Sequence, residues 1–536
     1  MRPHDEFTFS CVIFLFKKYH QTYIRYILMK LSRIYSVQNH HLQGKIVQVE
    51  ADVANGLHNF KIIGMADKSI DEAKDRIGAA LKHTGFTSPK HKNQKVVISL
   101  SPAEVKKQGS LFDVPIALSY LSAIGEVSFD AKKRVFVGEL ALNGQIQRVG
   151  GIIPLLIAAK HNGYKEVYIP KDNQEEGRFL AGDIKVYCAD TLPELVDHLE
   201  KKTLLKPLEK GTPQQSESAR TEFYLTSIKG NHFAKRALLI AAAGRHNMAL
   251  YGSPGTGKTL LAKTCQSLLP PLDTQERLQK AVIESITEES PDLSLRPTFR
   301  SPHHNTSTTA ILGGGNPIRP GEIARAHNGI LFLDEFPEFD SRSVEGLREP
   351  LEEKKITIAR SRECVEYPTD CMCIIAYNPC PCGYRFHTQK ECVCTQANID
   401  RYTKKLSGPI VDRIELWIPV EEVEYDQLLV SHKNKEREVQ ESAQERIIRA
   451  RQRQLTRNIF SKKGSLNSNI ASEDIIHHWN ISKNIIRTLE DFARKTSMSA
   501  RGYYATLRIA RTISDLDGDE EITKKSLLEA LQYRKK

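Results

Sequence analysis

The stretch ALYGSPGTGKTLLAK, residues 249–263, decides the fold of the middle of this chain. Its apolar start is followed by Gly252, by four further residues, and then by Gly257, Lys258 and Thr259, which is the spacing of a phosphate-binding loop between a strand and a helix. Glycines allow backbone N–H groups to turn inward onto phosphate oxygens, and the helix N-terminus adds positive potential. The sequence therefore predicts a site for ATP.

A second group of residues is expected to complete this site. The apolar segment ILFLDE ends in Asp334 and Glu335, and the apolar segment CMCIIAYN ends in Asn378. Thr259 and Asp334 are expected to hold Mg²⁺, and Glu335 to polarise the attacking water. Asn378 would face the γ-phosphate if its strand lies beside the strand of Asp334. The residues expected to contact the nucleotide are Gly252, Ser253, Pro254, Gly255, Thr256, Gly257, Lys258, Thr259 and Asp334.

The composition is that of a soluble globular protein with a basic balance. Of 536 residues, 40% are hydrophobic and 26% are charged, which argues against the disordered and membrane classes. The length predicts about three or four domains, and the net charge of +12 favours a polyanionic partner. The apolar run Cys11–Phe16 is far shorter than a membrane span, so we expect a cytoplasmic protein without a membrane partner.

Periodicity divides the chain into segments. The first part alternates strands such as KVVISL, RVFVGEL and EVYIP with amphipathic helices, and the Asn143-Gly144 pair suits a hairpin turn. After a linker rich in Gly, Pro, Ser and Gln, apolar strands and helices alternate as in a parallel sheet, and the last part has helical periodicity. Met29 is a candidate true start. The predicted boundaries are 1–28 for a mis-called extension, 29–200 for the first α/β domain, 201–222 for the linker, 223–423 for the nucleotide-binding core and 424–536 for the helical domain.

Six motifs occur in a characteristic order: GSPGTGKT, GEIARAHNGILFLDEFPEF, LREPLEE, YNPCPCG, GPIVDRIEL and SARGYYATLRIARTISDL. In this order, from about residue 29 to the end, the chain resembles the magnesium-chelatase-like ComM/YifB family of AAA+ ATPases. The resemblance implies an α/β fold with a parallel-sheet P-loop core and an all-α carboxyl-terminal lid. It also implies that Arg413 is an arginine finger for a neighbouring subunit, that Arg501 is a second sensor, and that the chain forms a homohexameric ring.

The segments KKQGSLFDVPIAL and GELALNGQIQRVGGIIPLLIAAK resemble the proteolytic domain of Lon-type proteases, which cut with a Ser-Lys dyad. Ser110 falls at the position of the nucleophile, but Ile153 stands where the lysine base is expected. A serine hydroxyl without a base is a poor nucleophile at neutral pH. We therefore expect residues 29–200 to be a Lon-protease-like domain without catalytic activity, in which Ser110 is structural.

Four cysteines lie within fifteen residues: Cys380, Cys382, Cys392 and Cys394. Four thiolates can close a tetrahedral Zn²⁺ site around a loop, so we predict a structural zinc. The alternative is a loop with two local pairs of reduced cysteines. His387 lies inside the loop and could replace one thiol. Two further cysteines, at 371 and 373, are expected in the core.

The candidate substrate contacts are basic. The inserted segment 296–327 resembles the loop of this clade that points to the pore, and its His303 and His304 are interpreted as loop residues without an acidic partner. Residues 352–368 suggest a hairpin that would line the pore with positive charge, suited to a phosphate backbone. The basic residues of this hairpin are Lys354, Lys355, Arg360 and Arg362, and a later helix carries Arg446, Arg449, Arg451, Arg453 and Arg457.

The resemblance implies an ATP-driven motor on single-stranded or branched DNA, a helicase that promotes branch migration during natural transformation. A metal-chelatase motor subunit, an ATP-dependent protease and a nucleotide-binding scaffold without turnover remain as alternatives. The Lon-like domain and the cysteine cluster weaken the chelatase reading, and Ile153 weakens the protease reading.

Overall fold

A computed structural model describes residues 31–65, 67–91, 93–103, 107, 109–211, 223–288, 291–360, 363–385, 387, 390–406, 410–423, 436–459 and 466–535. The predicted extension 1–28, the second half of the predicted linker and Arg362 lie outside these residues. The chain divides into two compact units, residues 1–212 with 284–293, and residues 213–283 with 294–536. Among the described residues, no helix combines the length and apolar character needed to cross a bilayer.

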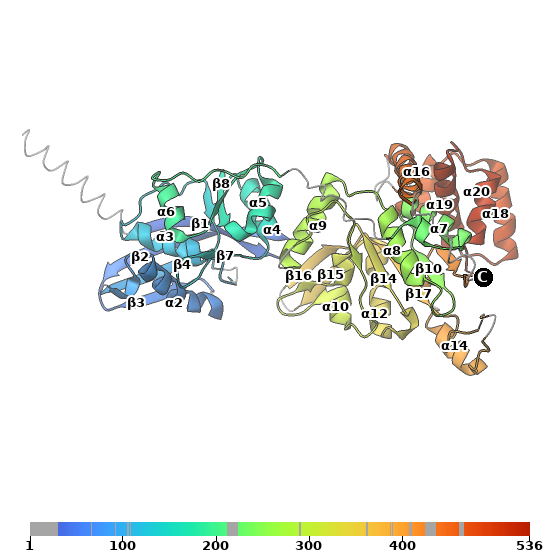
Figure 1. Cartoon of the computed structure of the whole chain (residues 1–536), viewed down its shortest axis with the longest axis horizontal. Coiled ribbons are helices and arrows are strands. Elements are labelled where there is room, and N and C mark those ends of the chain that lie inside the picture. The colour runs from blue at the N-terminus through green and yellow to red at the C-terminus, as the bar shows by residue number, and fades with distance from the viewer. Residues whose placement is uncertain are drawn as a thin grey trace, which may run out of the picture. The chain divides into compact units, whose positions relative to one another are not determined.

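The first unit contains two main sheets (Figure 1). One has the order β1-β2-β4-β3, and the other is the parallel sheet β5-β8-β9. The strands are β1 (Leu31–His40), β2 (Gln43–Asn55), β3 (Asn59–Ile63), β4 (Gln94–Ser101), β5 (Arg134–Phe136), β8 (Glu166–Pro170) and β9 (Lys185–Ala189). The helices are α2 (Lys68–His83), α3 (Asp113–Ala123), α4 (Ile152–His161), α5 (Gln174–Leu180) and α6 (Leu192–Leu199).

The predicted strand RVFVGEL is two strands in the structure. Its first part is β5, and its end is β6 (Glu139–Leu140), which pairs with β7 (Ile146–Gln147) in a separate hairpin. The predicted Asn143-Gly144 turn closes that hairpin, and Gly144 has a φ of +87°. The break falls at Gly138, where a Cβ would lie 2.8 Å from Val114 Cγ2, so the chain passes close to α3 there.

The second unit is built on a five-stranded parallel sheet with the order β11-β14-β17-β10-β18. Its strands are β11 (Phe299–Arg300), β14 (Ile330–Leu333), β17 (Met372–Tyr377), β10 (Met248–Tyr251) and β18 (Leu416–Pro419). Neighbouring residues of one strand enter two different cores: Met248 and Leu250 pack on one face, and Ala249 on the other. Burial on both faces explains the continuous apolar runs of these strands and confirms the predicted parallel α/β core.

Two short hairpins flank this sheet. One pairs β12 (Gly313–Gly314) with β13 (Arg319–Pro320), and the other pairs β15 (Lys355–Arg360) with β16 (Glu363–Pro368). The second one confirms the predicted hairpin of residues 352–368, although its first two residues belong to a helix. The helices of this part are α7 (His232–Gly244), α8 (Lys258–Leu268), α10 (Thr308–Leu312), α11 (Glu322–Arg325), α12 (Ser341–Gly346), α13 (Arg348–Glu353) and α14 (Gln396–Lys404). Helix α9 (Thr274–Thr287) begins in this unit, and its residues from 284 onward belong to the first unit.

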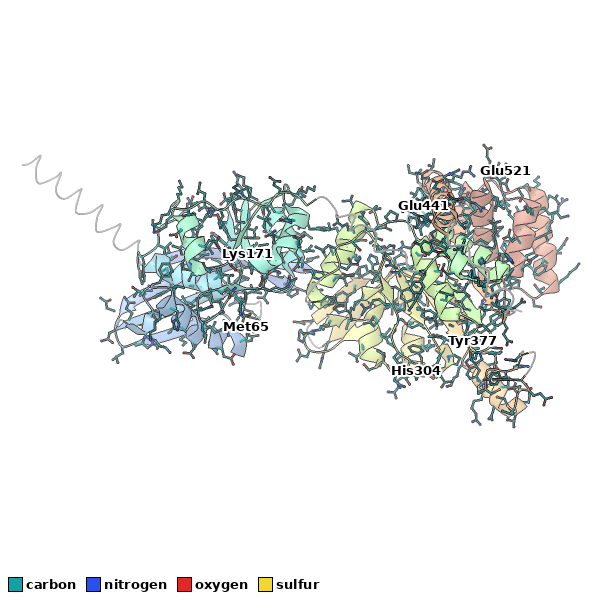
Figure 2. All side chains as sticks on the ribbon, viewed as in Figure 1. Met65, Lys171, His304, Tyr377, Glu441 and Glu521 are labelled. Atoms are coloured by element: carbon teal, nitrogen blue, oxygen red, sulfur yellow. The ribbon has the colours of Figure 1, made fainter. Side chains whose placement is uncertain are left out.

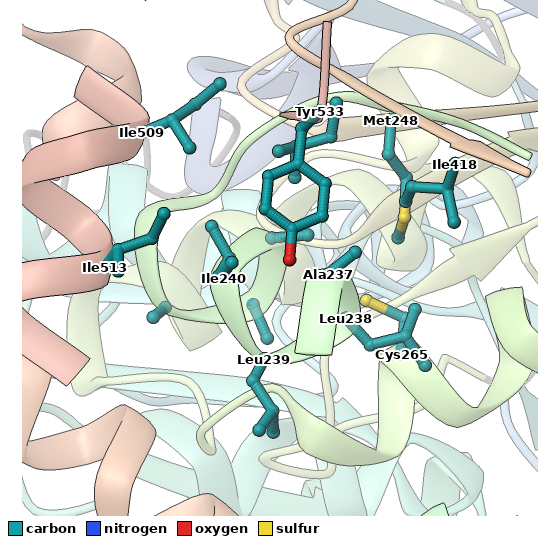
Figure 3. Packing of buried hydrophobic residues seen from close by; sticks show 14 of the residues in the cluster. Ala237, Leu238, Leu239, Ile240, Met248, Cys265, Ile418, Ile509, Ile513 and Tyr533 are labelled. Carbon is teal, nitrogen blue, oxygen red and sulfur yellow. The ribbon is translucent and has the colours of Figure 1, made fainter. Parts of the chain in front are cut away.

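The carboxyl-terminal helices share a hydrophobic core with the sheet. In Figure 3, Ile509 and Ile513 lie with Tyr533 in the cluster that contains α7 and the strand residues Met248 and Ile418. The core and the helices are therefore one compact unit, and the predicted boundary at 423/424 falls beside residues outside the described set. The helices are α16 (Glu436–Arg457), α17 (Ser472–His478), α18 (Lys483–Lys495), α19 (Ala500–Asp517) and α20 (Lys524–Gln532).

The arginines of α16, which the sequence offered as candidate substrate contacts, have partners within the protein. Arg457 forms an ion pair with the buried carboxylate of Asp515 at 2.7 Å, and Arg451 donates to the carbonyl oxygen of Ala242 at 2.7 Å. Arg446, Arg449 and Arg453 contact Asp517, Glu445 and the carbonyl oxygen of Asp515, respectively. Most of this charge therefore fastens α16 to α7 and α19, partners that are far away in the sequence.

Candidate nucleotide site

The phosphate-binding loop connects β10 to α8 at the carboxyl edge of the sheet. Gly255 and Gly257 have φ values of +81° and +89°, in the left-handed region that side chains disfavour. Gly252 is required for a different reason, since a Cβ there would lie 2.2 Å from the carbonyl oxygen of Val420. The glycine spacing in the sequence thus reflects both a turn and a close backbone approach.

Lys258 begins α8, and its ammonium group folds back over the loop. Its Nζ donates to the carbonyl oxygens of Gly252 and Ser253 at 2.8 and 2.9 Å and to Asn378 Oδ1 at 3.0 Å. The side chain is buried, and desolvation lowers the pKa of Lys258, while the nearby Asp334 carboxylate acts in the opposite direction. A cation held by three oxygen atoms at the mouth of the loop is suited to receive phosphate oxygens.

The two predicted acidic positions lie at the same edge. Asp334 directly follows β14, and its Oδ2 accepts a hydrogen bond from Thr259 Oγ1 at 3.0 Å. Strand β17 pairs with both β14 and β10, so Asn378 emerges between the strand of Asp334 and the strand of the loop. Tyr377, the last residue of β17, is labelled in Figure 2. The structure therefore brings together Lys258, Thr259, Asp334 and Asn378, as the chain order predicted.

Glu335 has a partner that the sequence did not reveal. Its Oε2 lies 3.1 Å from Nδ1 of His304, a residue of the segment that follows β11 and that Figure 2 labels. The interpretation of His304 as a loop residue without an acidic partner is therefore wrong. The separation of these two residues along the chain hid the pair, which forms because β11 and β14 are neighbouring parallel strands. His303 instead accepts from the backbone N–H of Asn305.

A cavity of about 470 Å³ lies beside the loop, between the start of α7 and the end of β18. Asn231 joins its two walls, because its side-chain amide donates to the Glu421 carbonyl oxygen at 3.1 Å and accepts from the Glu421 N–H at 3.0 Å. Val420 joins this wall to the loop, since its N–H donates to the Tyr251 carbonyl oxygen at 2.8 Å. Sequence reasoning missed this cavity. The available signal was the Gly230-Asn231 pair just before a helix, which suggests a backbone turn but no ligand.

The two predicted arginines lie together, but not at this edge. Arg413 precedes β18, and its carbonyl oxygen accepts from the Asn247 amide at 3.0 Å, so it belongs to the amino edge of the sheet. One carboxylate, that of Glu352 at the end of α13, contacts both arginines: Arg501 Nη2 lies 2.6 Å from its Oε1, and Arg413 Nη2 binds its Oε2. The strand β10 separates this group from the phosphate-binding loop of the same chain.

The four cysteines form one cluster just after Asn378. The Sγ atoms of Cys380, Cys382 and Cys392 are 3.4 to 3.6 Å apart, and all four thiols lie within 4.8 Å of one another. Four thiolates around Zn²⁺ at about 2.3 Å would be about 3.8 Å apart, so the donor set fits a zinc ion. The backbone N–H of Tyr384 lowers the pKa of Cys382 to about 6, which favours the thiolate form of this one cysteine, whereas the pKa values of the other three thiols are raised.

The cysteine loop touches the phosphate-binding loop. Gly383 has a φ of +84°, and a Cβ there would lie 2.5 Å from Cγ of Pro254. His387 is not gathered with the thiols, because its Nε2 lies 3.4 Å from Glu422 Oε1. The two cysteines expected in the core, Cys371 and Cys373, are buried at the start of β17, and both enter the same hydrophobic cluster.

The first unit holds the two residues that decided against proteolysis. Ser110 Oγ donates to the Glu139 carboxylate, and Ile153 is completely buried at the start of α4. The buried Ile153 side chain cannot supply the proton-accepting amine of a Ser-Lys dyad. This geometry agrees with a structural role for Ser110.

The basic hairpin β15–β16 packs on the β12–β13 hairpin. Arg360 Nη1 donates to the carbonyl oxygen of Gly315 at 2.5 Å. Lys355 forms an exposed ion pair with Glu366 at 2.7 Å, and Lys354 lies 3.4 Å from Asp370. The described hairpin therefore carries both signs of charge, with Arg360 near its tip.

Three family models match consecutive parts of the chain. The model "Subunit ChlI of Mg-chelatase" covers residues 49–173, "Magnesium chelatase, subunit ChlI" covers residues 224–428, and "Magnesium chelatase, subunit ChlI C-terminal" covers residues 437–534. These matches follow the order of the first unit, the sheet and the terminal helices.

Two relatives match over most of the chain, and a third matches a shorter part of it. Competence protein ComM of Haemophilus influenzae is 35% identical over 513 residues, 94% of this chain and 98% of that protein. YifB of Escherichia coli is 35% identical over 491 residues, 91% of this chain and 94% of that protein. Lon protease 2 of Bacillus subtilis is 26% identical over 169 residues, 29% of this chain and 30% of that protein.

Proposed function

The chain belongs to the magnesium-chelatase-like ComM/YifB family of AAA+ ATPases, and from that premise we propose that it is an ATP-driven ring motor acting on DNA. One observation carries the proposal: Lys258, Thr259, Asp334 and Asn378 meet at the carboxyl edge of the parallel sheet. Ligands of open parallel sheets bind outside the carboxyl ends of the strands, where loops and helix N-termini converge.

Each side chain has a defined task in hydrolysis. Lys258 exchanges its contacts with the loop carbonyl oxygens and Asn378 for oxygens of the β- and γ-phosphates. Thr259 and Asp334 hold Mg²⁺, which neutralises charge on the phosphates when it is bound. Glu335 polarises the attacking water, and Asn378 keeps contact with the terminal phosphate. The cavity lined by Asn231 and Glu421 is the place for the nucleoside.

The position of Arg413 supports assembly. Its carbonyl oxygen accepts a hydrogen bond from the Asn247 side chain. Strand β10 then leads from Asn247 to Gly252 of the phosphate-binding loop, five residues further on, which is a distance of roughly 16 Å along an extended chain. The guanidinium is also turned toward Glu352 rather than along the strand. An arginine in this place can reach the phosphates of an adjoining protomer rather than its own, so hydrolysis requires a ring, and the family implies a homohexamer.

The basic balance of the whole chain favours a polyanion as substrate. The chain carries a net charge of +12, and the hairpin near Arg360 would be repeated around a ring. Phosphate backbones bind such surfaces through counterion release with little sequence preference. The name of the relative from Haemophilus influenzae, competence protein ComM, agrees with the specific role that we assign: a helicase that promotes branch migration of single-stranded or branched DNA during natural transformation.

The four thiols hold a structural Zn²⁺ in this proposal. The cluster joins Asn378 to α14, and Gly383 rests on Pro254 of the phosphate-binding loop. A closed Cys₄ site is structural rather than catalytic, because it leaves no coordination position for water.

A DNA-dependent ATPase assay tests this function. We expect single-stranded or four-way-junction DNA to accelerate ATP turnover, and high salt to return turnover to its basal rate. The Lys258→Ala variant should not hydrolyse ATP. Unwinding of the junction should require ATP. Turnover indifferent to every DNA tested at low salt would contradict the DNA motor.

A metal-chelatase motor is the second candidate, because the matching family models carry that name. It would predict ATPase activity that DNA does not change. The protease reading has weaker support, since Ile153 is buried where a base is needed.

A further inference from the structure

We propose that Glu352 is a positioning residue for ATP hydrolysis, which holds Arg413 and Arg501 together as one unit that acts on the nucleotide of a neighbouring protomer. The inference rests on the proposed function, because it requires a ring in which one copy completes the site of the next. It adds a carboxylate from α13 to the catalytic assembly, in which the sequence had indicated only the two arginines.

The contact geometry carries the proposal. The two oxygens of a single carboxylate are divided between two guanidinium groups: Oε1 lies 2.6 Å from Arg501 Nη2, and Oε2 binds Arg413 Nη2. Charge-assisted hydrogen bonds between guanidinium and carboxylate groups are strong and directional. Without Glu352 no carboxylate would lie between these two cations, and they would repel each other.

Of the three side chains in this group, one is buried and two are exposed. The Arg413 side chain is 6% exposed, whereas those of Arg501 and Glu352 are 41% and 45% exposed. The Arg413 guanidinium, followed by that of Arg501, keeps the pKa of Glu352 below its usual value, so the carboxylate is ionised. The group is therefore anchored on one side and open to a partner on the other.

The backbone under Glu352 is fixed. Thr369, which precedes β17, donates from Oγ1 to the Pro350 carbonyl oxygen at 2.9 Å and from its N–H to the Lys354 carbonyl oxygen at 2.8 Å. Leu351 is buried between these two anchors. The backbone that carries the Glu352 carboxylate is therefore held in place, and the two arginine side chains contact the carboxylate there.

The group formed by the Glu352 carboxylate and the two guanidinium groups has a net charge of about +1. The γ-phosphate of a neighbour can therefore still attract the unit, while the fixed carboxylate limits where the guanidinium groups lie. A misplacement of about 1 Å in a catalytic group can lower a rate by roughly 100-fold. We expect Glu352→Gln to lower kcat by about 10- to 100-fold, with KM for ATP changed little because the variant's own phosphate-binding loop is intact.

Mixed rings distinguish action on a neighbour from a local structural effect. Glu335→Gln protomers cannot polarise water themselves but retain the arginine unit, and Glu352→Gln protomers retain a complete phosphate-binding edge. Mixing the two slow variants should recover turnover well above the sum of the separate rates. Glu353→Gln, the same change at the next residue, is the matched control and should turn over ATP like the wild type.

Three outcomes would overturn the proposal. Wild-type turnover by Glu352→Gln would show that the carboxylate positions nothing. Recovery when Arg413→Ala is mixed with Glu335→Gln, but not when Glu352→Gln is mixed with Glu335→Gln, would leave the ring function in place and remove the role of Glu352. Failure of both mixtures would remove the action between protomers, and with it the proposed ring function and this inference together.

Discussion

Replacing Gly383 by alanine tests whether the cysteine loop supports the phosphate-binding loop. The added Cβ would lie 2.5 and 2.6 Å from Cγ and Cδ of Pro254, where ordinary contacts begin at 3.4 Å. One of the two loops must move by about 1 Å, and overpacking of this kind costs about 1–3 kcal/mol. The φ of +84° adds a separate backbone cost of about 1–2 kcal/mol.

The strain should fall on the phosphate-binding loop. Gly383 is held between Cys382 and Tyr384, and its N–H donates to the Cys380 carbonyl oxygen at 3.0 Å, so the cysteine cluster fixes its position. If Pro254 yields, the overpacking of about 1–3 kcal/mol appears as a loss of nucleotide affinity of roughly 5- to 150-fold. The backbone cost would appear in the stability of the loop and not in the affinity.

Equilibrium titration with a fluorescent ATP analogue measures the effect. Gly85→Ala is the matched control, because Gly85 has nearly the same φ of +82° but nothing within 4 Å of its Cβ position. It should bind nucleotide like the wild type. Wild-type affinity in Gly383→Ala, with its zinc content unchanged, would refute the contact between the two loops.

Three further predictions concern other parts of the second unit. Burial lowers the pKa of His327 to about 4, so between pH 6.5 and 4 the unfolded chain binds a proton that the folded chain does not. The free energy of unfolding should therefore fall as the pH drops through this range, by about 3 kcal/mol at most. Denaturant unfolding of His327→Gln should show a flatter pH dependence than the wild type, and an unchanged pH dependence would contradict the low pKa of His327. Cys382→Ser should lose zinc by elemental analysis, whereas Cys364→Ser, exposed on the β15–β16 hairpin, should keep it; equal metal content would exclude the thiol site. Arg360→Ala should lower DNA-stimulated but not basal ATPase activity by about 2- to 10-fold, as expected for the loss of about 1 kcal/mol of a phosphate contact, and full stimulation would show that this hairpin does not contact DNA.

The sequence predicted those features that depend on neighbours along the chain. The glycine spacing from Gly252 to Gly257 specifies a loop by backbone geometry alone, and apolar runs that end in Asp334 and Asn378 specify buried strands with polar ends. The Asn143-Gly144 turn was predictable for the same reason. The first strand was not predicted, because polar side chains fill several of its buried positions; Ser36, for example, donates to the Phe136 carbonyl oxygen.

The partners of His304 and of the α16 arginines could not be predicted from the sequence. The pairing of His304 with Glu335 follows from the order of strands in the sheet, and the arginines of α16 are held by partners such as Asp515, far along the chain. In both cases the sequence showed the chemical groups but not which groups would meet.

The sequence by itself determined the chemistry of this protein: a phosphate cradle, two acidic residues, four thiols and two arginines in a fixed order. Only the tertiary structure decided their grouping, with Lys258 and Asn378 at one edge of the sheet, and with Arg413 and Arg501 on the carboxylate of Glu352. The physical reason is that local geometry depends on the identity of adjacent residues, whereas ion pairs and strand order form between segments that only the folded chain brings together.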